Sequence, residues 1–483
     1  MLPTNTTTEE ITPRTQPSLA QRLRAALRVP AGDGGDLALT AALRTQHPAD
    51  IAEAMSELAR PEALAVFNWL DNVRAAEVLD EVDSELVRYI LDNAPPGRIA
   101  DLLDRLPMDD AAEVVSEASR ENAEELLAAL SERSPEDAAE VRELLSYGDQ
   151  TAGRLMTDKF MRLTGDSTVD KAFDAIRHAD PDVETLNDLY VVEPHRGQRN
   201  EERLLGVLSL RDLVRARPSQ RIRDIMVRDP ITVTVDTDQE EVARLISKYD
   251  FLAMPVLDRN GSLAGIVTVD DVVDVLVEEQ TEDVLKQSGI SVEPGVINQP
   301  YFTVPVLKVF RSRIGWLMLL FVAETATGVV LRHFEDELAR VVALSFYVPL
   351  LIGTGGNTGA QTVSTIIRGI ALKEIRGKDT GRVLVRELIS GLLLGLALGA
   401  VGFGRALLWD HSPGGIQIAL VVGLTILAIC TWANTIGSLI PLLAQRLKID
   451  PALVSAPLIT TLVDATGLAI YLTIAKVLLT QLH

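Results

Sequence analysis

Two acidic side chains stand in long apolar stretches of the chain. Asp464 interrupts "ITTLVDATGLAIYLTIAKVLL", residues 459–479, and Glu324 interrupts "LLFVAETATG", residues 319–328. An ionised carboxylate in an apolar setting is costly unless a cation, a hydrogen bond or water compensates it. We interpret Asp464 as a cation ligand, with a buried structural hydrogen bond as the alternative. Glu324 has the alternative of facing a cytoplasmic or dimer-interface cavity.

A denser set of acids follows residue 271. The segment "VVDVLVEEQTEDVLKQSG", residues 272–289, predicts a helix with several carboxylates and an apolar face at residues 275–277 and 284–285. Such a run is typical of a solvated helix face. Because this helix leads directly to the apolar third of the chain, it is also placed to couple the two parts.

The charge distribution separates those parts. The 483 residues carry a formal charge of −22, and residues 50–300 alone carry −28, with 54 acidic against 26 basic side chains. Residues 301–483 have 10 acidic and 15 basic side chains and are mostly apolar. The acidic part excludes binding to nucleic acid or to an anionic membrane surface, and it favours cations.

The cysteine content gives no redox signal, and the first residues give no targeting signal. Cys430 is the single cysteine, so an intrachain disulfide is excluded. The start, "MLPTNTTTEEITPRTQ", lacks the apolar core of a signal peptide. We expect residues 1–49 to be a disordered, variable lead.

The last third predicts five membrane spans, each near or above the ~20 residues that cross a bilayer. They are residues 314–331, 341–372, 388–408, 415–444 and 452–479. Basic residues gather before the first span and in the loops after the second and fourth: Lys308, Arg311, Arg313, Arg368, Lys373, Arg376, Lys378, Arg382, Arg386, Arg446 and Lys448. The positive-inside rule then places the acidic part in the cytoplasm and the C-terminus outside.

The second span contains "YVPLLIGTGGNTGAQTVSTI", residues 347–366, with four glycines in seven residues. Glycine disfavours a helix, so this stretch predicts backbone that is broken or that lines a polar path. The alternative is close packing of helices through small residues, which is compatible with such a path.

The acidic part divides into two domains. Residues 50–147 contain short amphipathic segments separated by prolines, such as "ARPEALAVFNWL", and predict an all-helical domain. From residue 151 short strands alternate with helices, and the pattern repeats. Residues 155–176, "LMTDKFMRLTGDSTVDKAFDAI", are echoed by residues 225–246, "IMVRDPITVTVDTDQEEVARLI".

The repeat also carries a recurring Ser/Thr and Asp. "LLGVLSLRDLV", residues 204–214, and "LAGIVTVDDVV", residues 263–273, each place a Ser or Thr three residues before an Asp at a helix start. Taken alone, this pattern is as well explained by helix capping. Two such units resemble a cystathionine-β-synthase (CBS) domain pair over residues 151–275. The resemblance implies an adenine nucleotide site at Asp212 and Arg211, with Tyr190 and Phe251 as further candidates.

The order of these parts resembles the MgtE family of magnesium transporters and channels over residues 50–480. The matching segments are "FYVPLLIGTGGNTGAQ" (346–361), "RELISGLLLGL" (386–396) and "DPALVSAPLITTLVDATGLAIYL" (450–472). The resemblance implies a homodimer, without enzymatic activity, whose pore between subunits binds hydrated Mg²⁺ at Asp464. It further implies gating by cytosolic Mg²⁺, with ATP as a modulator. The implied sensor acids are Glu77, Asp109, Glu113, Glu240, Asp250, Asp271, Asp274, Glu279, Glu282 and Asp283.

The expected fold is multidomain: an all-α helical domain, an α+β CBS pair, a connecting helix and a five-helix transmembrane domain. The boundaries are 1–49, 50–147, 151–275, 276–310 and 311–483. Ala360 and Ala456 occupy positions where some family members have asparagine near the pore. Selectivity is therefore open, and the alternatives are transport of Co²⁺, Mn²⁺ or Ca²⁺, a CBS-bearing sensor that transports nothing, or an intramembrane aspartyl protease.

Overall fold

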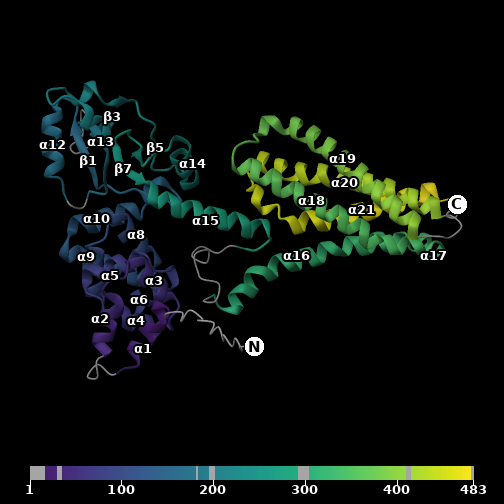
Figure 1. Ribbon diagram of the computed structural model, residues 1–483, viewed down its shortest axis with the longest axis horizontal. Helices are drawn as coiled ribbons and strands as arrows, with labels where there is room; N and C mark the ends of the chain where they lie inside the picture. Colours follow the sequence, from purple (N-terminus) through teal and green to yellow (C-terminus); the bar gives the residue numbers. More distant parts are fainter. Residues whose placement is uncertain are drawn as a thin grey trace, which may run out of the picture. The chain divides into compact units, whose positions relative to one another are not determined.

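The computed structural model describes residues 17–29, 35–180, 183–194, 202–291, 304–409 and 415–479. They form two compact units, one ending at Glu278 and one beginning at Glu279. The expected fold class is confirmed: a helical domain and two small sheets precede a region of long apolar helices (Figure 1). Residues 292–303 of the expected linker lie outside the described residues.

The first unit begins with a stack of short helices (Figure 1). Their bounds are α1 Leu19–Leu27, α2 Gly35–Leu43, α3 Pro48–Ser56, α4 Arg60–Trp69, α5 Asn72–Asp80, α6 Ser84–Asn93, α7 Pro96–Leu103, α8 Met108–Glu117, α9 Arg120–Arg133 and α10 Pro135–Leu144. Polar caps set several starts: Asp71 accepts from two backbone N–H groups of α5, and Asp83 accepts from one of α6. Apolar residues of successive helices share one core.

The expected disordered lead is wrong for part of its length. Residues 19–27 and 35–43 are helical, and Leu23 of α1 and Leu43 of α2 are fully buried in the core of the helical domain. Ser18 caps α1 through the backbone of Gln21, whose side chain returns the bond. A capping box followed by an amphipathic segment is a local helix signal, and a judgement based on composition alone does not detect it.

Two small sheets form the rest of the first unit. A four-stranded sheet has the order β1-β2-β3-β4 and a three-stranded sheet the order β5-β6-β7. In each, a parallel pair (β1 with β2, β5 with β6) is followed by an antiparallel one. The bounds are β1 Phe160–Thr164, β2 Thr185–Pro194, β3 Glu202–Ser209, β4 Val227–Arg228, β5 Val233–Thr234, β6 Ala253–Leu257 and β7 Leu263–Thr268.

The helices between these strands preserve the repeat seen in the sequence. α12, Val169–Arg177, and α14, Gln239–Tyr249, each join the parallel strands, whereas α13, Leu210–Arg215, and α15, Val269–Gln287, each follow the last strand of a repeat. A short helix α11, Ala152–Leu155, and a 3₁₀ turn η2, Ile222–Asp224, complete the unit.

The second unit is built from long helices. They are α16 Val306–His333, α17 Glu335–Arg340, α18 Val348–Ala371, α19 Thr380–Trp409, α20 Gly415–Arg446 and α21 Ala456–Leu478, with 3₁₀ turns η3 Val342–Tyr347, η4 Gly377–Asp379 and η5 Pro451–Leu453. Among the described residues, four helices are long and apolar enough to cross a membrane: α16, the η4–α19 segment, α20 and α21. α18 is long enough, but it exposes a polar row along one face: Asn357, Gln361, Ser364, Thr365 and Arg368.

The glycine-rich segment does not break α18, so the expectation of interrupted backbone is wrong. The glycines instead allow close packing. A Cβ added to Gly355 would lie 2.6 Å from Ile429 of α20 and 2.9 Å from Val463 of α21. Close packing at glycine also joins α19 to α20, where Gly391 lies against the backbone of Thr431 and Gly395 against that of Leu427. Small residues spaced by four are a common basis of helix association in membranes.

A buried chain of hydrogen bonds ties three of these helices together. Thr362 of α18 donates to Asn434 Oδ1 of α20 over 2.9 Å. Asn434 in turn donates from Nδ2 to the Glu387 carboxylate of α19 over 3.3 Å. Asn434 is only 1% exposed, so this network satisfies a polar group that would otherwise be costly in an apolar core.

Candidate functional site

Asp464 is a residue of α21, and its side chain lies beside the glycine-rich face of α18. Ser455 caps α21 by accepting from the N–H of Leu458, and Pro457 occupies the first turn, so the helix start is well defined. Asp464 follows about two turns later and is half-buried. A Cβ built on Gly356 would lie 3.5 Å from Asp464 Oδ1, at van der Waals contact, so the carboxylate lies beside this turn of α18.

The charge of Asp464 has no compensating partner in the described part of the chain. Within those residues the carboxylate makes no hydrogen bond and no ion pair, with arginine or any other cation. The alternative of a structural hydrogen bond therefore gains no support. Ala360 and Ala456 are half-buried and bring no amide to the helices around Asp464. A carboxylate without a partner in an apolar helix is a candidate ion ligand.

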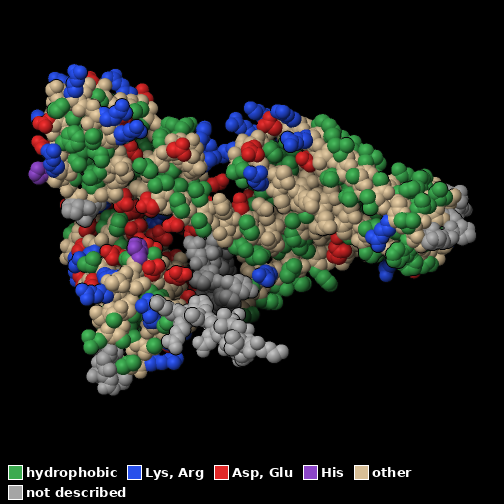
Figure 2. All heavy atoms as spheres, in the orientation of Figure 1, with side chains coloured by type: hydrophobic (Ala, Val, Ile, Leu, Met, Phe, Trp, Pro, Cys, Tyr) green, Lys and Arg blue, Asp and Glu red, His purple; other side chains and the backbone are tan. Residues whose placement is uncertain are grey.

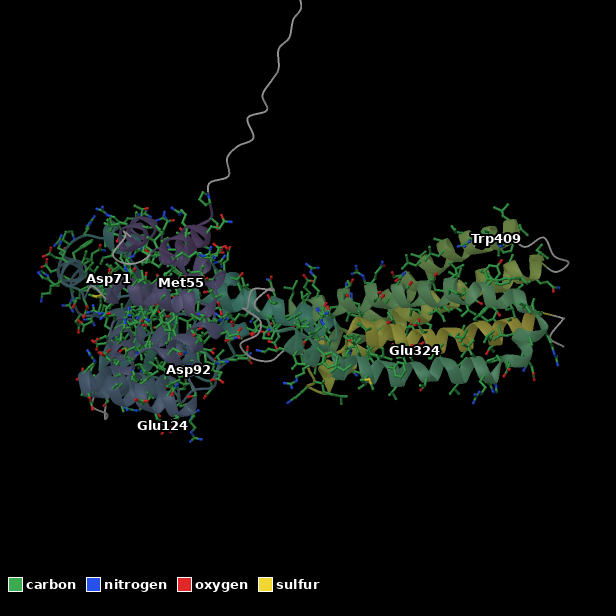
Figure 3. All side chains as sticks on the ribbon, turned by 90° about the horizontal axis from the view of Figure 1, so that it is seen from below. Met55, Asp71, Asp92, Glu124, Glu324 and Trp409 are labelled. Carbon is green, nitrogen blue, oxygen red and sulfur yellow. The ribbon has the colours of Figure 1, made fainter. Side chains whose placement is uncertain are left out.

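Glu324 lies part-way along α16 and is exposed (Figure 3). α16 packs along α21, and the Trp316 indole donates to Ser455 Oγ over 3.0 Å. Glu324 of α16 and Asp464 of α21 therefore lie on helices that pack against each other. The two acids singled out in the sequence are thus brought to neighbouring helices.

A second acidic group lies in the first unit, where the C-terminal helices of the helical domain approach the start of α15. Figure 2 shows Asp and Glu side chains gathered between the two parts of this unit. Displacement of water by the protein, followed by the charge of Asp271, raises the pKa of Asp109. Burial also raises the pKa of Asp271 to about 6, against the lowering effect of its hydrogen bond from Thr268. Asp109 and Asp271 are both half-buried.

Glu113 and Asp274 belong to the same group. Loss of water around the carboxyl group, and then the charge of Glu278, raises the pKa of Glu113. The same loss of water, and then the charge of Asp270, raises the pKa of Asp274. Glu113 and Asp274 are exposed, so solvent screens their interactions more strongly than those of the half-buried acids. Like charges held together in this way are stabilised by a bound cation or by protons.

The sequence did not single out Asp80, Asp110 and Glu278 as members of this group. Burial and then Glu113 raise the pKa of Asp80, and burial and then Asp80 raise that of Asp110. The local signals were the pair Asp109–Asp110 in the first turn of α8 and, for Glu278, its place in the acidic run of residues 272–289. The meeting of α5 with α8 depends on tertiary packing.

The remaining expected sensor acids are distributed more widely. Glu77 is exposed on α5, one turn before Asp80. Glu240 opens α14 and Asp250 ends it in a left-handed conformation, with φ 55°. Neither is among the charges identified as raising the pKa values of the group around Asp109. Glu279 is half-buried on α15.

The end of α15 carries an ammonium group among its acids. Lys286 Nζ lies 2.7 Å from Glu282 Oε1 and 2.8 Å from Oδ2 of Asp450, beside η5. Burial lowers the pKa of Lys286, but its hydrogen bonds to Asp450 and Glu282 outweigh this and raise it. Burial and then the charge of Asp450 raise the pKa of Asp283. Lys286 thus already neutralises part of the negative charge of Glu282, Asp283 and Asp450 at the end of α15.

In the described ranges, no three His, Cys, Asp or Glu side chains converge closely enough to form a ready-made metal centre. The donor chemistry nonetheless suits Mg²⁺, which takes oxygen ligands and commonly keeps several of its waters. Asp109 Oδ1 is also buried without a hydrogen-bond partner in the described part of the chain. The acids around Asp109 therefore fit a hydrated ion better than a directly ligated one.

The expected nucleotide residues occupy contrasting environments. Ser209 Oγ donates to Asp212 Oδ2 over 2.7 Å and accepts from the Asp212 N–H over 3.1 Å, which is a helix cap at α13. Arg211 and Asp212 are exposed. Tyr190 is fully buried, and its ring contacts Phe160 edge to face.

Neither aromatic candidate presents an isolated open face. The Tyr190 hydroxyl has no hydrogen-bond partner in the described residues, and burial, then Asp188, raises its pKa. Phe251 is half-buried and stacks on Tyr249, with ring centroids 5.5 Å apart. Among the four nucleotide candidates, Arg211 and Asp212 are the accessible ones.

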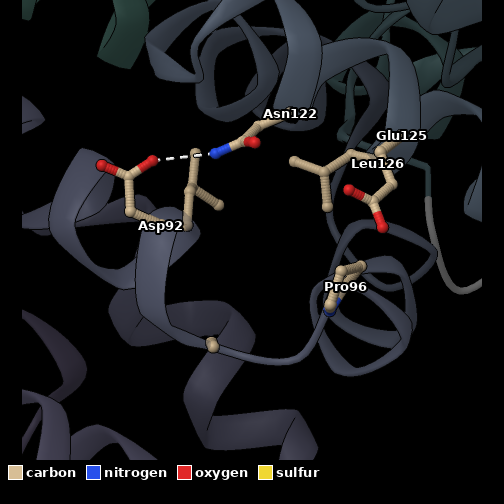
Figure 4. Close-up of a pocket in the computed structure, with 7 residues that line it drawn as sticks. Asp92, Pro96, Asn122, Glu125 and Leu126 are labelled. Atoms are coloured by element: carbon tan, nitrogen blue, oxygen red, sulfur yellow. Dashed lines mark hydrogen bonds between the residues drawn. The ribbon is translucent and has the colours of Figure 1, made fainter.

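A hollow on the helical domain involves none of the expected site residues. Asn122 of α9 donates to Asp92 of α6 across its wall over 2.8 Å (Figure 4). The lining residues are Leu91, Asp92, Ala94, Pro96, Asn122, Glu125 and Leu126. Their mixture of apolar and acidic groups gives no recognisable catalytic or ligand arrangement.

Comparison with known families covers the same parts of the chain. The divalent cation transporter family MgtE matches residues 348–474, the MgtE intracellular N domain matches 46–150, and the CBS domain matches 152–219 and 222–278. The magnesium transporter MgtE of Thermus thermophilus is 40% identical over 461 residues, 95% of this chain and 99% of that protein. The magnesium transporter MgtE of Enterococcus faecalis is 36% identical over 341 residues, 71% of this chain and 72% of that protein.

Solved structures resemble the first part of the chain. The soluble part of a magnesium transporter is 30% identical, with a TM-score of 0.47, covering 54% of this chain and 99% of that one. The cytosolic domain of the Mg²⁺ channel MgtE in complex with ATP is 37% identical, with a TM-score of 0.44, covering 53% of this chain and 99% of that one.

Proposed function

Since this chain belongs to the MgtE family of magnesium transporters, we propose that it forms a homodimeric Mg²⁺ channel gated by Mg²⁺ on its cytosolic side. Members of this family are membrane transporters and not enzymes, so the protease alternative is set aside. The observation that carries the proposal is the half-buried carboxylate of Asp464, which lies against Gly356 without a partner in the described part of the chain.

Asp464 is the proposed ion ligand of the pore. Mg²⁺ gives up its waters reluctantly, so a carboxylate holds the ion through its hydration shell. Asp464 is only half-buried beside Gly356, so its side chain remains accessible for such outer-shell binding. Two copies of Asp464 in a dimer would form a ring of carboxylates, which is a recurring cation filter.

The polar face of α18 supports the homodimer. Asn357 and Gln361 are exposed on that face in a single chain. Polar side chains within a membrane face a partner, a bundle interior or water, because contact with lipid is costly. A second copy with a water-filled path between the subunits would satisfy both residues.

The acids around Asp109 and along α15 are the proposed sensor. At high cytosolic Mg²⁺, bound ions would offset the repulsion between the helical domain, the CBS pair and α15, and the channel would close. At low Mg²⁺ the same carboxylates repel one another and the closed state loses stability. The full proposed set stays as expected from the sequence, with Asp80, Asp110 and Glu278 added.

Two further assignments belong to the proposal. The basic residues in the first turns of α16, from the end of α18 to the start of α19, and at the end of α20 support a cytoplasmic N-terminal part and an external C-terminus in a bacterial inner membrane. The domain limits 151–275, 276–310 and 311–483 are kept in the proposal, and the helical domain expected at 50–147 is extended to include α1 and α2. Adenine nucleotide is proposed to bind at Asp212 and Arg211, which are accessible, with weaker support for Tyr190 and Phe251.

Ion flux into liposomes tests the transport function. Purified protein is reconstituted, and uptake of Mg²⁺, Co²⁺, Mn²⁺ and Ca²⁺ is compared with that of the Asp464→Ala variant. We expect Mg²⁺ uptake that the substitution abolishes; uptake that survives unchanged defeats the pore assignment. Conformational change with Mg²⁺ but without flux of any ion would favour the non-transporting sensor.

The gating proposal has its own test. The double variant Asp274→Asn, Glu282→Gln removes two charges from α15, and we expect flux to continue at internal Mg²⁺ levels that close the wild type. Closure at the same internal Mg²⁺ as the wild type would refute the sensor assignment, and the pore assignment would stand.

A further inference from the structure

Among the described residues of the long helices α16 and α18–α21, Glu324 is the one acid that is exposed in the single chain and that the proposed function does not use. It is exposed on α16 and makes no hydrogen bond or ion pair with the described residues. Glu387, the other acid embedded in these helices, accepts from Asn434 and is accounted for by that bond. In a membrane-spanning helix, an unpaired carboxylate is costly unless it faces water or a cation.

Two contacts fix the depth of Glu324 relative to Asp464. Trp316 of α16 donates to Ser455 at the start of α21, and Lys476 near the end of α21 pairs with Glu337 just after α16. Both contacts join residues that are 139 positions apart in the sequence, so the segment from Trp316 to Glu337 and the segment from Ser455 to Lys476 have equal length. Because the earlier residue of one segment contacts the earlier residue of the other, α16 and α21 run in the same direction. They remain in register over the length between the two contacts.

Within that register Glu324 and Asp464 lie at nearly the same level. Glu324 follows Trp316 by eight residues and Asp464 follows Ser455 by nine. At 1.5 Å per helical residue, the two positions differ by about 1.5 Å along the helix axis.

We propose that Glu324 is a second cation-facing carboxylate of the ion path, level with Asp464, and that it raises the preference of the path for hydrated divalent cations. This inference rests on the proposed function of Asp464. In the proposed dimer, two copies of Asp464 and two of Glu324 place four negative charges around the path. A divalent ion compensates more of this charge than a monovalent ion does, and uncompensated charge is costly in surroundings of low dielectric constant.

The pair also bears on the missing amides at residues 360 and 456. An asparagine near the pore would hold the water shell of the ion by neutral hydrogen bonds, and alanine provides none. A carboxylate bonds to the same waters more strongly, because hydrogen bonds to an ionised acceptor are roughly twice as strong as neutral ones. Glu324 supplies that acceptor from α16.

The first test compares four proteins in the same liposome assay. Glu324→Gln removes the charge and keeps the shape, Glu324→Asp keeps the charge, and Glu335→Gln removes an exposed acid just beyond α16 as the matched control. We expect Glu324→Gln to raise the half-saturating Mg²⁺ concentration about tenfold, or about 1.4 kcal/mol. Glu324→Asp should stay within about threefold of wild type, and Glu335→Gln should be unchanged.

The outcomes separate this inference from the proposed function. If Asp464→Ala abolishes flux and Glu324→Gln behaves as wild type, Glu324 has no role in the path and this inference fails alone. If Asp464→Ala leaves flux unchanged, the proposed function fails first.

A second measurement remains informative if Glu324→Gln does not fold. Glu324→Cys is made in a Cys430→Ser background, so that the introduced thiol is the only one in the chain. We expect membrane-impermeant thiol reagents to react from water, with a negatively charged reagent restoring the low half-saturating Mg²⁺ concentration and a positively charged one blocking flux. A thiol that reacts only with lipid-soluble reagents would place residue 324 against lipid and overturn the inference.

Discussion

Neutralising Asp271 is expected to stabilise the first unit when Mg²⁺ is absent. The folded unit raises the pKa of this carboxyl to about 6, chiefly through burial, and further through Asp270 and Glu184. A raised pKa in the folded state gives stability that is complete below the unfolded pKa, near 4, and that is lost as pH rises through about 6. Asp271→Asn removes this loss.

The size of the effect follows from the pKa difference. One pKa unit corresponds to 1.36 kcal/mol, and partial solvent screening of a half-buried group reduces the full value, so we expect about 1–3 kcal/mol at pH 7.5. For a unit of this size each kcal/mol changes Tm by about 2–4 °C. Mg²⁺ at about 100 times its Kd would return roughly 2.7 kcal/mol to the wild type, and less to the variant.

Thermal unfolding of a fragment ending at Gln287 measures these quantities, at pH 5 and pH 7.5, with and without Mg²⁺. Glu124→Gln is the control, because Glu124 is a highly exposed acid on α9 (Figure 3). The wild type should lose stability between pH 5 and pH 7.5 without Mg²⁺, and Asp271→Asn should lose less. A variant that is less stable than wild type at pH 7.5 without Mg²⁺, or equally dependent on Mg²⁺, refutes the reasoning.

Two other substitutions have defined outcomes. Lys286→Gln removes the ammonium that competes with cations for Glu282 and Asp450, so the internal Mg²⁺ concentration that half-closes the channel should fall about three- to tenfold in the flux assay; an unchanged or higher value contradicts this. Tyr190→Phe removes a buried hydroxyl without a partner in the described residues, so the free energy of unfolding, measured by thermal unfolding, should stay level or rise by about 1 kcal/mol. A loss above about 2 kcal/mol would reveal a bond to that hydroxyl.

The sequence predicted most of the long helices because hydropathy and length are local properties. α19, α20 and α21 lie within a few residues of their expected bounds at most ends, although α19 begins eight residues early. The glycine-rich α18 was expected to be interrupted, because helix propensity describes a solvated helix. Packing of Gly355 against Ile429 and Val463 overrides that propensity.

Site residues could be predicted from the sequence where each is a single charge within an apolar run. Asp464 and Glu324 were visible as single charges in apolar runs, but their common level depends on contacts between α16 and α21. Asp80 could not be grouped with Asp109 from sequence, because the two residues are 29 positions apart and their helices, α5 and α8, meet only through tertiary packing. The burial of Tyr190 also had no local signal, since four consecutive residues of β2 from Leu189 to Val192 are all buried and the usual alternation is missing.

A density map of the assembled protein in lipid at high Mg²⁺ examines the ion path most directly. We predict an ion, surrounded by its waters, within hydrogen-bonding reach of the Asp464 carboxylates of both subunits, in a water-filled space between them. A map in which Asp464 faces lipid or pairs with a basic side chain would contradict the assignment of Asp464 as the pore ligand.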